Sequence, residues 1–562
     1  MVSKLYTKFL LLKLEKWASE NSIIAKEQAG FQKGKSTLDH SFVIHHLVRK
    51  YTQAGRKKLY AAFVDLSSAF DTINRSRLWR KLAETNIDKR LLLLLIKLHT
   101  NTNLRVRLGP HGMLSEEITT EKGVRQGCLL APFLFNFYIN NIVPELQGLD
   151  FFPPTIGDIK LPILLYADDI ALFSLTPVGL RRLLAKLSTY CSHEKLTINH
   201  AKTKVMTFGN HRRKHTWRLG DFPIEQVSAF RYLGIIFGPH LSWSKHLDSA
   251  RLKAAHAIQA LLHFTRSKGG NLVPPATEIF AKKLIPQMTF GAEIWGYTNI
   301  STLDAAQNTF IRSILCVPRS TPASLLRAEV GLISVAATCH SALVRYWHKL
   351  SQMNDTSLPK ICFREQLANP SLKSWVSAVK QITDSYGIDL DSLTALPLKC
   401  VKASLKDTIR LFHIRSDLCT ISSSPYSSSL PLYKSTFVME NYLTWITSFA
   451  LRKAFTALRF QCMPSRVLEG RHENLPYHLR ICPCHLGEVE DITHYLLRCP
   501  HYHSPRSRFL ASSLTSIQDR PNLAQVCWLL ADINANTTLN VANFALAAIN
   551  IRARLFPVHL SF

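Results

Sequence analysis

The chain has 562 residues, of which 46% are hydrophobic, so it is long enough for three or four domains with buried cores. Lys and Arg outnumber Asp and Glu by 69 to 39, and the formal net charge of +30 favours a polyanionic partner, nucleic acid before a membrane surface. This composition excludes global disorder, and the 12 cysteines, mostly scattered singly, are more typical of a reducing compartment than of a disulfide framework.

The first 240 residues have the pattern of mixed helix and strand. Apolar runs at 59–64, 163–166 and 170–173 predict short buried strands. Leucines then recur at helical spacing from Leu180 onward, with Pro177 near the start of the run, and this predicts a helix before "LTIN". The first part of the chain should therefore pack helices against a sheet.

The remainder of the chain is mainly helical in pattern. Residues from about 245 to 350 carry apolar side chains at helical spacing, and "ISSSPYSSSLP" at 421–431 is the clearest linker. A helical stretch follows the linker, and a compact group of cysteines and histidines lies between Cys482 and Cys499.

The most apolar run, "LLLLLI" at 91–96, is flanked by basic residues and is far shorter than the roughly 20 residues that a membrane-spanning helix needs. No secretory signal is visible at the start of the sequence. We therefore expect a soluble intracellular protein, nuclear and/or cytoplasmic, without a membrane partner.

The segment "LLYADDIALFS" at 164–174 places Asp168 and Asp169 side by side between apolar runs. Two-residue hairpin turns favour Asn-Gly or Asp-Gly, so the absence of glycine here makes turn chemistry a poor explanation of the pair. The alternative is an acidic turn exposed to solvent. A second apolar strand, in "AAFVDLSSAFDTI" at 61–73, ends at another aspartate, Asp65.

Three carboxylates that converge at the ends of neighbouring strands are costly unless cations pair with them. Oxygen ligands of this kind suit Mg²⁺ or Mn²⁺. Two such ions about 3.5–4 Å apart can activate an attacking hydroxyl and stabilise a leaving oxygen in nucleotidyl transfer.

Five motifs occur in the order of the palm motifs of a reverse transcriptase: "FVDLSSAFD", "GVRQGCLLAPFLFN", "LLYADD", "LTINHAKTKVM" and "FRYLGIIF". The residues of these motifs resemble those of the polymerases of non-LTR (LINE-type) retrotransposons. The likeness runs from "EQAGFQKGKST" at 27 to about residue 240 and continues more weakly through "FGAEIWG" at 290–296.

The resemblance implies an α+β right-hand polymerase with an antiparallel palm sheet. It implies reverse transcriptase fingers and palm at 1–240, a helical thumb at 241–350, a helical connector at 351–470, a zinc-knuckle-like module at 471–510 and a helical C-terminal tail at 511–562. The implied function is an RNA-directed DNA polymerase that extends a DNA 3′-hydroxyl on an RNA template, as in target-primed retrotransposition. Its partners would be the RNA template, a DNA primer or target, and dNTPs.

Residue by residue, the resemblance implies Asp65, Asp168 and Asp169 as the carboxylates that bind Mg²⁺ or Mn²⁺. Lys202 matches the family lysine near the triphosphate, a possible proton donor to pyrophosphate, with Lys204 as the residue that could be confused with it. Asp71 lies in the same motif as Asp65, but the family does not use that position for metal, and a structural or capping role is preferred.

Phe70 occupies the steric-gate position that selects dNTPs, although simple core packing is an alternative. Gln126 and Gly127 resemble the loop that lines the nucleotide and template pocket, where a glycine lets the backbone approach a ligand. "FRYLG" at 230–234 resembles the primer-grip hairpin. Lys33 and Lys35 would contact phosphates or would be ordinary surface lysines.

The C-terminal cluster "CPCHLGEVEDITHYLLRC" supplies Cys482, Cys484, His494 and Cys499 with the spacing C-x-C-x9-H-x4-C. Three sulfurs and one imidazole fit a closed, structural Zn²⁺ site. Reduced cysteines in a helical corner are the alternative, and His485 and His501 are nearby substitutes for His494. The resemblance implies a knuckle that holds RNA or target DNA, but the spacing differs from the retroviral C-x2-C-x4-H-x4-C knuckle.

Two other functions compete with the polymerase: a catalytically weak, truncated relic that only binds nucleic acid, and another two-metal enzyme such as a nuclease. The three intact carboxylates favour the polymerase, and the order of the motifs disfavours the nuclease. Neither the first 27 residues nor the 63 residues after Cys499 contain an endonuclease pattern, so the sequence resembles an N-terminally truncated reading frame without the endonuclease.

Overall fold

The computed structural model describes residues 2–53, 58–100, 102–109, 112–125, 127–148, 151–210, 215–267, 273–369, 373–423, 433–434, 436–531 and 534–556. The chain forms two compact units. Unit 1 comprises Met1–His246, Glu293–Trp295 and Tyr346–Gln381, and unit 2 comprises Leu247–Ala292, Gly296–Arg345 and Ile382–Phe562.

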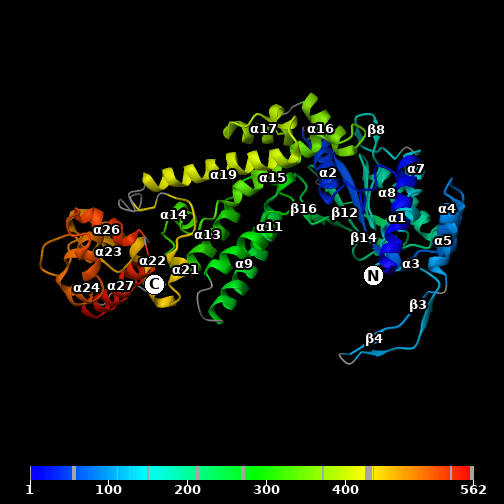
Figure 1. Ribbon diagram of the computed structural model, residues 1–562. Coiled ribbons are helices and arrows are strands. Elements are labelled where there is room, and N and C mark those ends of the chain that lie inside the picture. The colour runs from blue at the N-terminus through cyan, green and yellow to red at the C-terminus, as the bar shows by residue number, and fades with distance from the viewer. Residues whose placement is uncertain are drawn as a thin grey trace. The chain divides into compact units, whose positions relative to one another are not determined.

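Unit 1 contains all the described strands and the helices around them (Figure 1). Its helices are α1 (Val2–Glu20), α2 (Thr37–Thr52), α3 (Ala69–Thr72), α4 (Arg75–Ala83), α5 (Lys89–His99), α6 (Ala131–Ile139), α7 (Ile142–Gln147), α8 (Pro177–His193) and α16 (Leu358–Ala368). Its first strands are β1 (Leu59–Val64), β2 (Leu66–Ser67), β3 (Thr102–Leu104), β4 (Arg107–Leu108), β5 (Met113–Leu114), β6 (Ile118–Thr120), β7 (Thr155–Ile156) and β8 (Ile159–Lys160). The others are β9 (Ile163–Tyr166), β10 (Asp169–Ser174), β11 (Thr197–Ile198), β12 (Lys204–Phe208), β13 (Trp217–Leu219), β14 (Phe222–Val227), β15 (Phe230–Tyr232) and β16 (Ile235–Phe237).

Unit 2 is built from helices. They are α10 (Val273–Ile279), η1 (Phe280–Leu284), α11 (Ile285–Met288), α13 (Ser301–Leu315), α14 (Ala323–Val330), α18 (Leu390–Thr394), α19 (Leu398–Ser422), α21 (Tyr442–Trp445), α22 (Phe449–Arg459), α23 (Arg466–His472), η2 (Tyr477–Leu479), η3 (His494–Arg498), η4 (Pro500–Tyr502), α24 (His503–Phe509), α25 (Ala511–Thr515), α26 (Asn522–Leu530) and α27 (Ala535–Leu555). Four further helices have residues in both units: α9 (Ser244–Ser267), α12 (Ala292–Trp295), α15 (Val335–Ser351) and α17 (Trp375–Ser385).

A six-stranded sheet forms the centre of unit 1, in the order β13-β14-β12-β1-β10-β9. Neighbouring strands are antiparallel, except that β12 and β14 are parallel. All six residues of β1 are buried, as expected for a central strand covered on both faces. The three strands predicted from the apolar runs are confirmed, as are the helix from Pro177 and the mainly helical region after 245.

Alternate residues of β1 face two different layers. Ala62 and Val64 belong to a large apolar core that also contains Leu134 of α6 and Leu184 of α8. On the other face, the ring of Phe63 stacks on Phe230 of the β15–β16 hairpin, with the ring centroids 4.4 Å apart. The hairpin that resembles the primer grip is therefore packed directly on the central strand.

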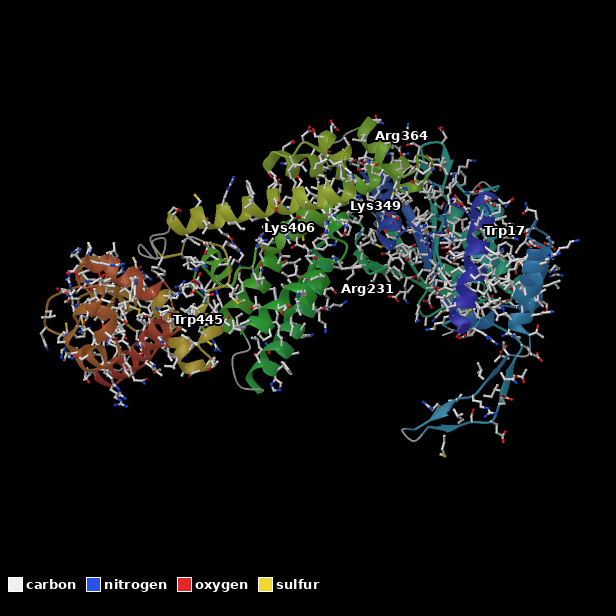
Figure 2. All side chains as sticks on the ribbon, in the orientation of Figure 1. Trp17, Arg231, Lys349, Arg364, Lys406 and Trp445 are labelled. Carbon is white, nitrogen blue, oxygen red and sulfur yellow. The ribbon has the colours of Figure 1, made fainter. Side chains whose placement is uncertain are left out.

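Residues far along the chain complete unit 1 by packing on α2. Trp375 of α17 contacts Phe42 edge to face at 5.1 Å between centroids. Lys349 of α15, labelled in Figure 2, forms an ion pair of 2.7 Å with Asp39, and His46 lies 2.9 Å from the Glu365 carboxylate of α16. These contacts explain why Tyr346–Gln381 belongs to the same unit as the sheet.

Two buried arginines organise the C-terminal part of unit 2. Arg459 of α22 pairs with Glu329 at 2.7 Å, and Arg552 of α27 pairs with Glu490 at 2.9 Å, where both partners are almost completely buried. Removal of one member of such a pair leaves an uncompensated charge and is strongly destabilising. Glu490 lies in the Cys/His segment, so this segment is packed against α27.

The predicted linker at 421–431 falls mostly on residues 424–431, which lie outside the described residues. Helix α19 continues to Ser422, so the first residues of this segment are helical. Among the described residues, no helix combines the length and apolar character that crossing a bilayer requires.

The segment before α2 lies along the free edge of β9. The Leu165 amide donates to the Glu27 carbonyl, and the Ala29 amide donates to the Leu165 carbonyl, both at 2.9 Å. These bonds satisfy backbone groups that an edge strand otherwise leaves unpaired.

Gly30, at the end of this segment, lies so close to the backbone of the β9–β10 turn that a larger side chain does not fit. A Cβ built on Gly30 would lie 2.3 Å from the Ala167 amide nitrogen. The Gly30 and Ala167 amides both donate to the side-chain oxygen of Gln28, at 2.8 and 3.0 Å, and the Asn136 amide group donates to the Gly30 carbonyl at 2.7 Å. The segment is thus fastened to the β9–β10 turn.

We predict that Gly30→Ala destabilises the protein by about 3 kcal/mol or more, because two backbone segments must separate to admit the methyl group. Gly148→Ala is the matched control, since Gly148 has helical dihedrals and its Cβ would meet nothing closer than 3.8 Å. Chemical denaturation of both variants measures the difference. Equal stabilities would contradict the tight packing of Gly30 and Gln28 on the β9–β10 turn, which we call the Gln28 clamp.

Candidate active site and Cys/His cluster

The three predicted carboxylates lie at the ends of paired strands. Val64 of β1 pairs with Ile170 of β10, so the next residue on each strand, Asp65 and Asp169, are neighbours across the sheet. Asp168 precedes Asp169 in the turn that joins β9 to β10. The structure therefore brings Asp65, Asp168 and Asp169 to one edge of the sheet.

The β9–β10 hairpin has a two-residue turn, because Asp169 pairs with Tyr166 and leaves only Ala167 and Asp168 between the strands. Ala167 has a φ of +54°, a value that tight hairpins require and that glycine usually supplies. A non-glycine residue there costs free energy, and such strain persists only where the surroundings enforce it. The hydrogen bond from the Ala167 amide to Gln28 is one such restraint.

Burial and mutual repulsion disfavour the charged forms of the pair. Burial, followed by the negative charges of Asp168 and Asp65, raises the pKa of Asp169 to about 6. Burial, followed by the charge of Asp65, also raises the pKa of Asp168. An arrangement in which carboxylates are pushed toward protonation has a strong affinity for cations.

Lys202 is the cation that the fold supplies at this edge. Its ammonium nitrogen lies 3.6 Å from Asp65 Oδ2, and its side chain is 69% exposed, so it is free to reorient toward a ligand. The Asn199 side chain accepts from the Lys202 amide at 3.2 Å, while the Asn199 amide donates to the Asp65 carbonyl at 2.8 Å. Lys204, the residue that could be confused with it, pairs instead with Glu225 at 3.0 Å.

Two of the three carboxylates, those of Asp65 and Asp168, line a hollow of about 520 Å³. The polar residues that line it include Asp65, Ser67, Asp168, Asn199 and Lys202. Carboxylate, hydroxyl and amide oxygens form the donor set that Mg²⁺ and Mn²⁺ prefer, and one lysine leaves most of the negative charge uncompensated. The residues present therefore fit divalent cations.

Phe70 lies in the wall of the same hollow. Its ring stacks on Phe135 at 4.8 Å between centroids and meets Phe31 edge to face at 6.4 Å. Its carbonyl accepts from the Val124 amide at 2.9 Å, which ties α3 to the loop before α6. Gly127 in that loop has a φ of +74°, while Gln126 lies outside the described residues.

The sequence-predicted lysines of the 31–36 loop have different surroundings. Lys35 Nζ donates to the Gln28 carbonyl at 2.6 Å, which favours a role in holding the loop. Lys33 lines a larger hollow next to Phe31.

The four predicted zinc ligands form one buried cluster in unit 2. The sulfur atoms of Cys482, Cys484 and Cys499 and a ring nitrogen of His494 all lie within 4.8 Å of one another. Cys482 and Cys499 sulfurs are 3.9 Å apart, and the Cys484 sulfur is 3.3 Å from His494 Nε2. Three sulfurs and one imidazole around one point fit a tetrahedral Zn²⁺ site.

The Cys482 thiol next to Cys499 lowers the pKa of the Cys499 thiol, which favours the thiolate that metals bind. His485 and His501 are not members of the cluster in the described residues. His485 is exposed with a φ of +69°, and the ring of His501 packs against Phe556.

Glu488 is a residue that sequence reasoning missed. Its carboxylate accepts from His494 Nδ1 at 2.8 Å and from Arg498 at 3.0 Å. Metal-binding histidines usually donate their second ring N–H to a carboxylate, which fixes the tautomer and the ring. The signal in the sequence was a glutamate between the cysteines and the histidine, but only the loop conformation shows which ring nitrogen it meets.

The strand-end carboxylates, the adjacent lysine and the aromatic wall lie together at one side of unit 1. Residues 1–237 match the family model described as "Reverse transcriptase (RNA-dependent DNA polymerase)". This region of the chain is similar to the reverse transcriptases, and the curated relatives it matches include proteins of non-LTR, LINE-type retrotransposons.

Three relatives illustrate this likeness. The Pol polyprotein of the R2 element of Popillia japonica is 29% identical over 252 residues, which are 41% of this chain and 35% of that protein. The probable RNA-directed DNA polymerases of transposon BS and of the X-element of Drosophila melanogaster are each 24% identical, over 62% and 68% of this chain and 39% and 42% of their own lengths. The chain thus spans less than half the length of these relatives.

We predict that the charge of Asp169 destabilises the metal-free protein, and that this contribution is fully present above pH 6. The folded-state pKa of Asp169 is raised to about 6, above the roughly 3.9 of an unfolded aspartate, so stability falls as pH rises between these values. Asp169→Asn should raise the thermal midpoint at pH 7.5, and Mg²⁺ should raise the midpoint of the wild type more at pH 7.5 than at pH 5.

Asp221→Asn, which removes an exposed carboxylate of the same unit, is the control. Calorimetry with and without Mg²⁺ tests this expectation. If Mg²⁺ leaves the thermal midpoint of the wild type unchanged at both pH values, the cation site is contradicted.

Proposed function

We propose that the chain is an RNA-directed DNA polymerase that extends a DNA 3′-hydroxyl on an RNA template with dNTPs. The observation that carries this proposal is the convergence of Asp65, Asp168 and Asp169 at the end of the β1–β10 pair, in a region that is similar to the reverse transcriptases. The non-LTR relatives extend the proposal to target-primed synthesis.

The three carboxylates would hold Mg²⁺ or Mn²⁺. Such ions, when bound, supply Lewis-acid activation of the 3′-hydroxyl and charge compensation for the leaving pyrophosphate. The sheet holds Asp65 and Asp169 in register, and the Gln28 clamp holds Asp168 in its strained turn, so the charges need no rearrangement before substrates bind.

The remaining site residues act on the nucleotide. Lys202, exposed beside Asp65, would contact the triphosphate and donate a proton to the pyrophosphate. Phe70, fixed between Phe135 and Phe31, would exclude a ribose 2′-hydroxyl. Gly127, at a positive φ, lets the backbone of the loop approach the nucleotide, and Gln126 would line the same pocket.

We also propose the division of the chain that the resemblance implies. Fingers and palm occupy 1–240, the thumb occupies 241–350, the connector occupies 351–470, the knuckle occupies 471–510 and the tail occupies 511–562. The packing of Arg552 on Glu490 supports a knuckle that is stabilised by the helix that follows it.

We predict that Asp168→Asn combined with Asp169→Asn lowers primer extension roughly a thousandfold or more, because the metal-binding charge is lost. Affinity for a primer–template should change little, since the formal charge of +30 drives binding. Extension of oligo(dT) on poly(rA) with dTTP and Mg²⁺ measures the first effect, and fluorescence anisotropy measures the second.

Asp71→Asn is the matched control, because Asp71 is an acid of the same motif that lines the same hollow. It should retain extension. Full activity in the double variant would show that Asp168 and Asp169 have no role in polymerisation. An inactive wild type that still binds nucleic acid would favour the alternative of a truncated relic that only binds nucleic acid.

We further propose that Cys482, Cys484, His494 and Cys499 hold one structural Zn²⁺. The burial of the four side chains and the completed set of four ligands support a closed site. Glu488 would orient His494 through Nδ1 and leave Nε2 for the metal.

We predict one Zn²⁺ per purified chain, a strong loss of zinc in Cys499→Ser, and roughly 10- to 100-fold weaker zinc binding in Glu488→Gln. Cys419→Ser, at an exposed cysteine outside the cluster, should keep the metal. Elemental analysis and competition with a chelator give these values. Zinc content that is unchanged in Cys499→Ser would show that the cluster is not the ligand set.

A further inference from the structure

Phe31 has an unusual combination of backbone strain and exposure. Its φ is +54°, in the left-handed region that a bulky side chain rarely adopts, and its side chain is 62% exposed. A ring so exposed contributes little burial to set against the strain. Strained residues of this kind cluster at binding sites, where the surrounding structure enforces the conformation.

The backbone that carries Phe31 is held rigidly against the candidate active site. The preceding residue, Gly30, is bonded through its carbonyl to Asn136 and through its amide to Gln28, which also accepts from Ala167 in the β9–β10 turn. The backbone next to Phe31 is therefore held against the β9–β10 turn that carries Asp168.

The ring faces a large open space. It meets Phe70 only at an edge, with an interplanar angle of 89°. Both phenylalanines line a hollow of about 1340 Å³, whose walls also include Lys33 and Gly127. An exposed aromatic face next to lysines is the combination that binds single-stranded nucleic acid, because bases stack on the ring and phosphates approach the cations.

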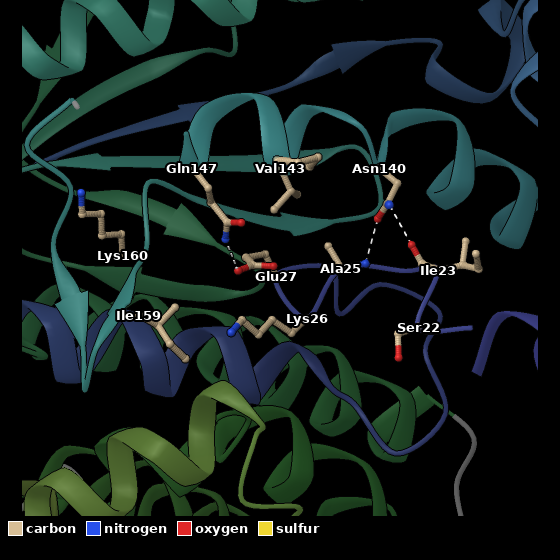
Figure 3. A pocket seen from close by; sticks show the side chains of 11 residues that line it. Ser22, Ile23, Ala25, Lys26, Glu27, Asn140, Val143, Gln147, Ile159 and Lys160 are labelled. Atoms are coloured by element: carbon tan, nitrogen blue, oxygen red, sulfur yellow. Dashed lines mark hydrogen bonds between the residues drawn. The ribbon is translucent and has the colours of Figure 1, made fainter. Parts of the chain in front are cut away.

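The hollow continues beyond Phe31. It shares Ser22, Ala25 and Lys26 with a second hollow of about 500 Å³, which extends to Lys160 of β8. Figure 3 shows this second hollow, where the Gln147 amide donates to Glu27 between the two lysines. The two hollows adjoin at these shared residues, and we call them together the trough, whose lining includes Phe70 and Phe31 in one hollow and Lys160 in the other.

We propose that Phe31 is the stacking platform for an unpaired base of the template strand, and that the strand continues along the trough past Lys26 and Lys160. This inference rests on the proposed polymerase function, since it takes the strand to be the template. It adds a residue that selects single-stranded template by its bases rather than by its backbone.

The test uses the full chain carrying Asp168→Asn and Asp169→Asn, so that no extension occurs during binding. Fluorescence anisotropy gives its affinity for a primer–template with a six-nucleotide 5′ overhang, and for the same duplex with an abasic overhang. Stacking should make the normal overhang bind roughly tenfold more tightly than the abasic one.

Phe31→Ala and Phe31→Leu should remove this preference, and Phe31→Trp should keep it. Lys26→Ala with Lys160→Ala should weaken both overhangs equally, whereas Lys89→Ala with Lys97→Ala, at exposed lysines of α5, should change neither. A preference that survives in Phe31→Ala or Phe31→Leu would overturn the proposal.

Phe31→Gly separates stacking from a structural role. Glycine relieves the strain at φ +54°, so the thermal midpoint should rise while the preference for bases disappears. A lowered midpoint would assign the ring to the core and overturn the proposal. The preference for overhang bases is measured in an inactive variant, so it is independent of primer extension. A lost preference would contradict only the stacking role of Phe31, and a lack of extension by the wild type would contradict only the polymerase function.

Discussion

The repulsion among three carboxylates at one edge of a buried sheet is the constraint on which the site depends. Asp65 and Asp169 are neighbours because Val64 and Ile170 pair, and Asp168 is held in a turn that strains Ala167. Burial and mutual repulsion raise the pKa values of Asp168 and Asp169, and carboxylates in such an arrangement favour the binding of cations. The β1–β10 register and the Gln28 clamp on the β9–β10 turn hold the three carboxylates in this arrangement.

The two candidate metal sites differ in their donor atoms and in their exposure to solvent. The strand-end site has oxygen donors, an open hollow and an exposed lysine, which suit ions that exchange ligands with substrates. The Cys/His cluster is buried, its four ligand positions are filled from the chain, and Glu488 orients its histidine. A zinc site with four ligands from the chain has no open position for a reacting group, so the proposed chemistry is assigned to unit 1.

Three of the non-glycine residues with positive φ values belong to the segments around the candidate active site. Ser68 precedes α3, Ala167 lies in the β9–β10 turn, and Phe31 follows the clamp. Each of them costs stability that a glycine would save.

Local pattern in the sequence predicts three strands of the central sheet, the order of the motifs and the residues that carry charge. Apolar runs that end in Asp65 and in Asp168 can be read from local pattern alone, as can the spacing of Cys482, Cys484, His494 and Cys499. These features depend on neighbours in sequence, which the chain displays directly.

Which groups from distant parts of the chain meet is visible only in the folded structure. It paired Lys202 with Asp65 and Lys204 with Glu225, although the two lysines are two residues apart on one segment. It placed Glu488 on His494 and left His485 exposed. It also revealed the clamp from Gln28 and the strained, open ring of Phe31, because backbone dihedrals and contacts across the sheet follow from the packing of the whole unit rather than from any local pattern.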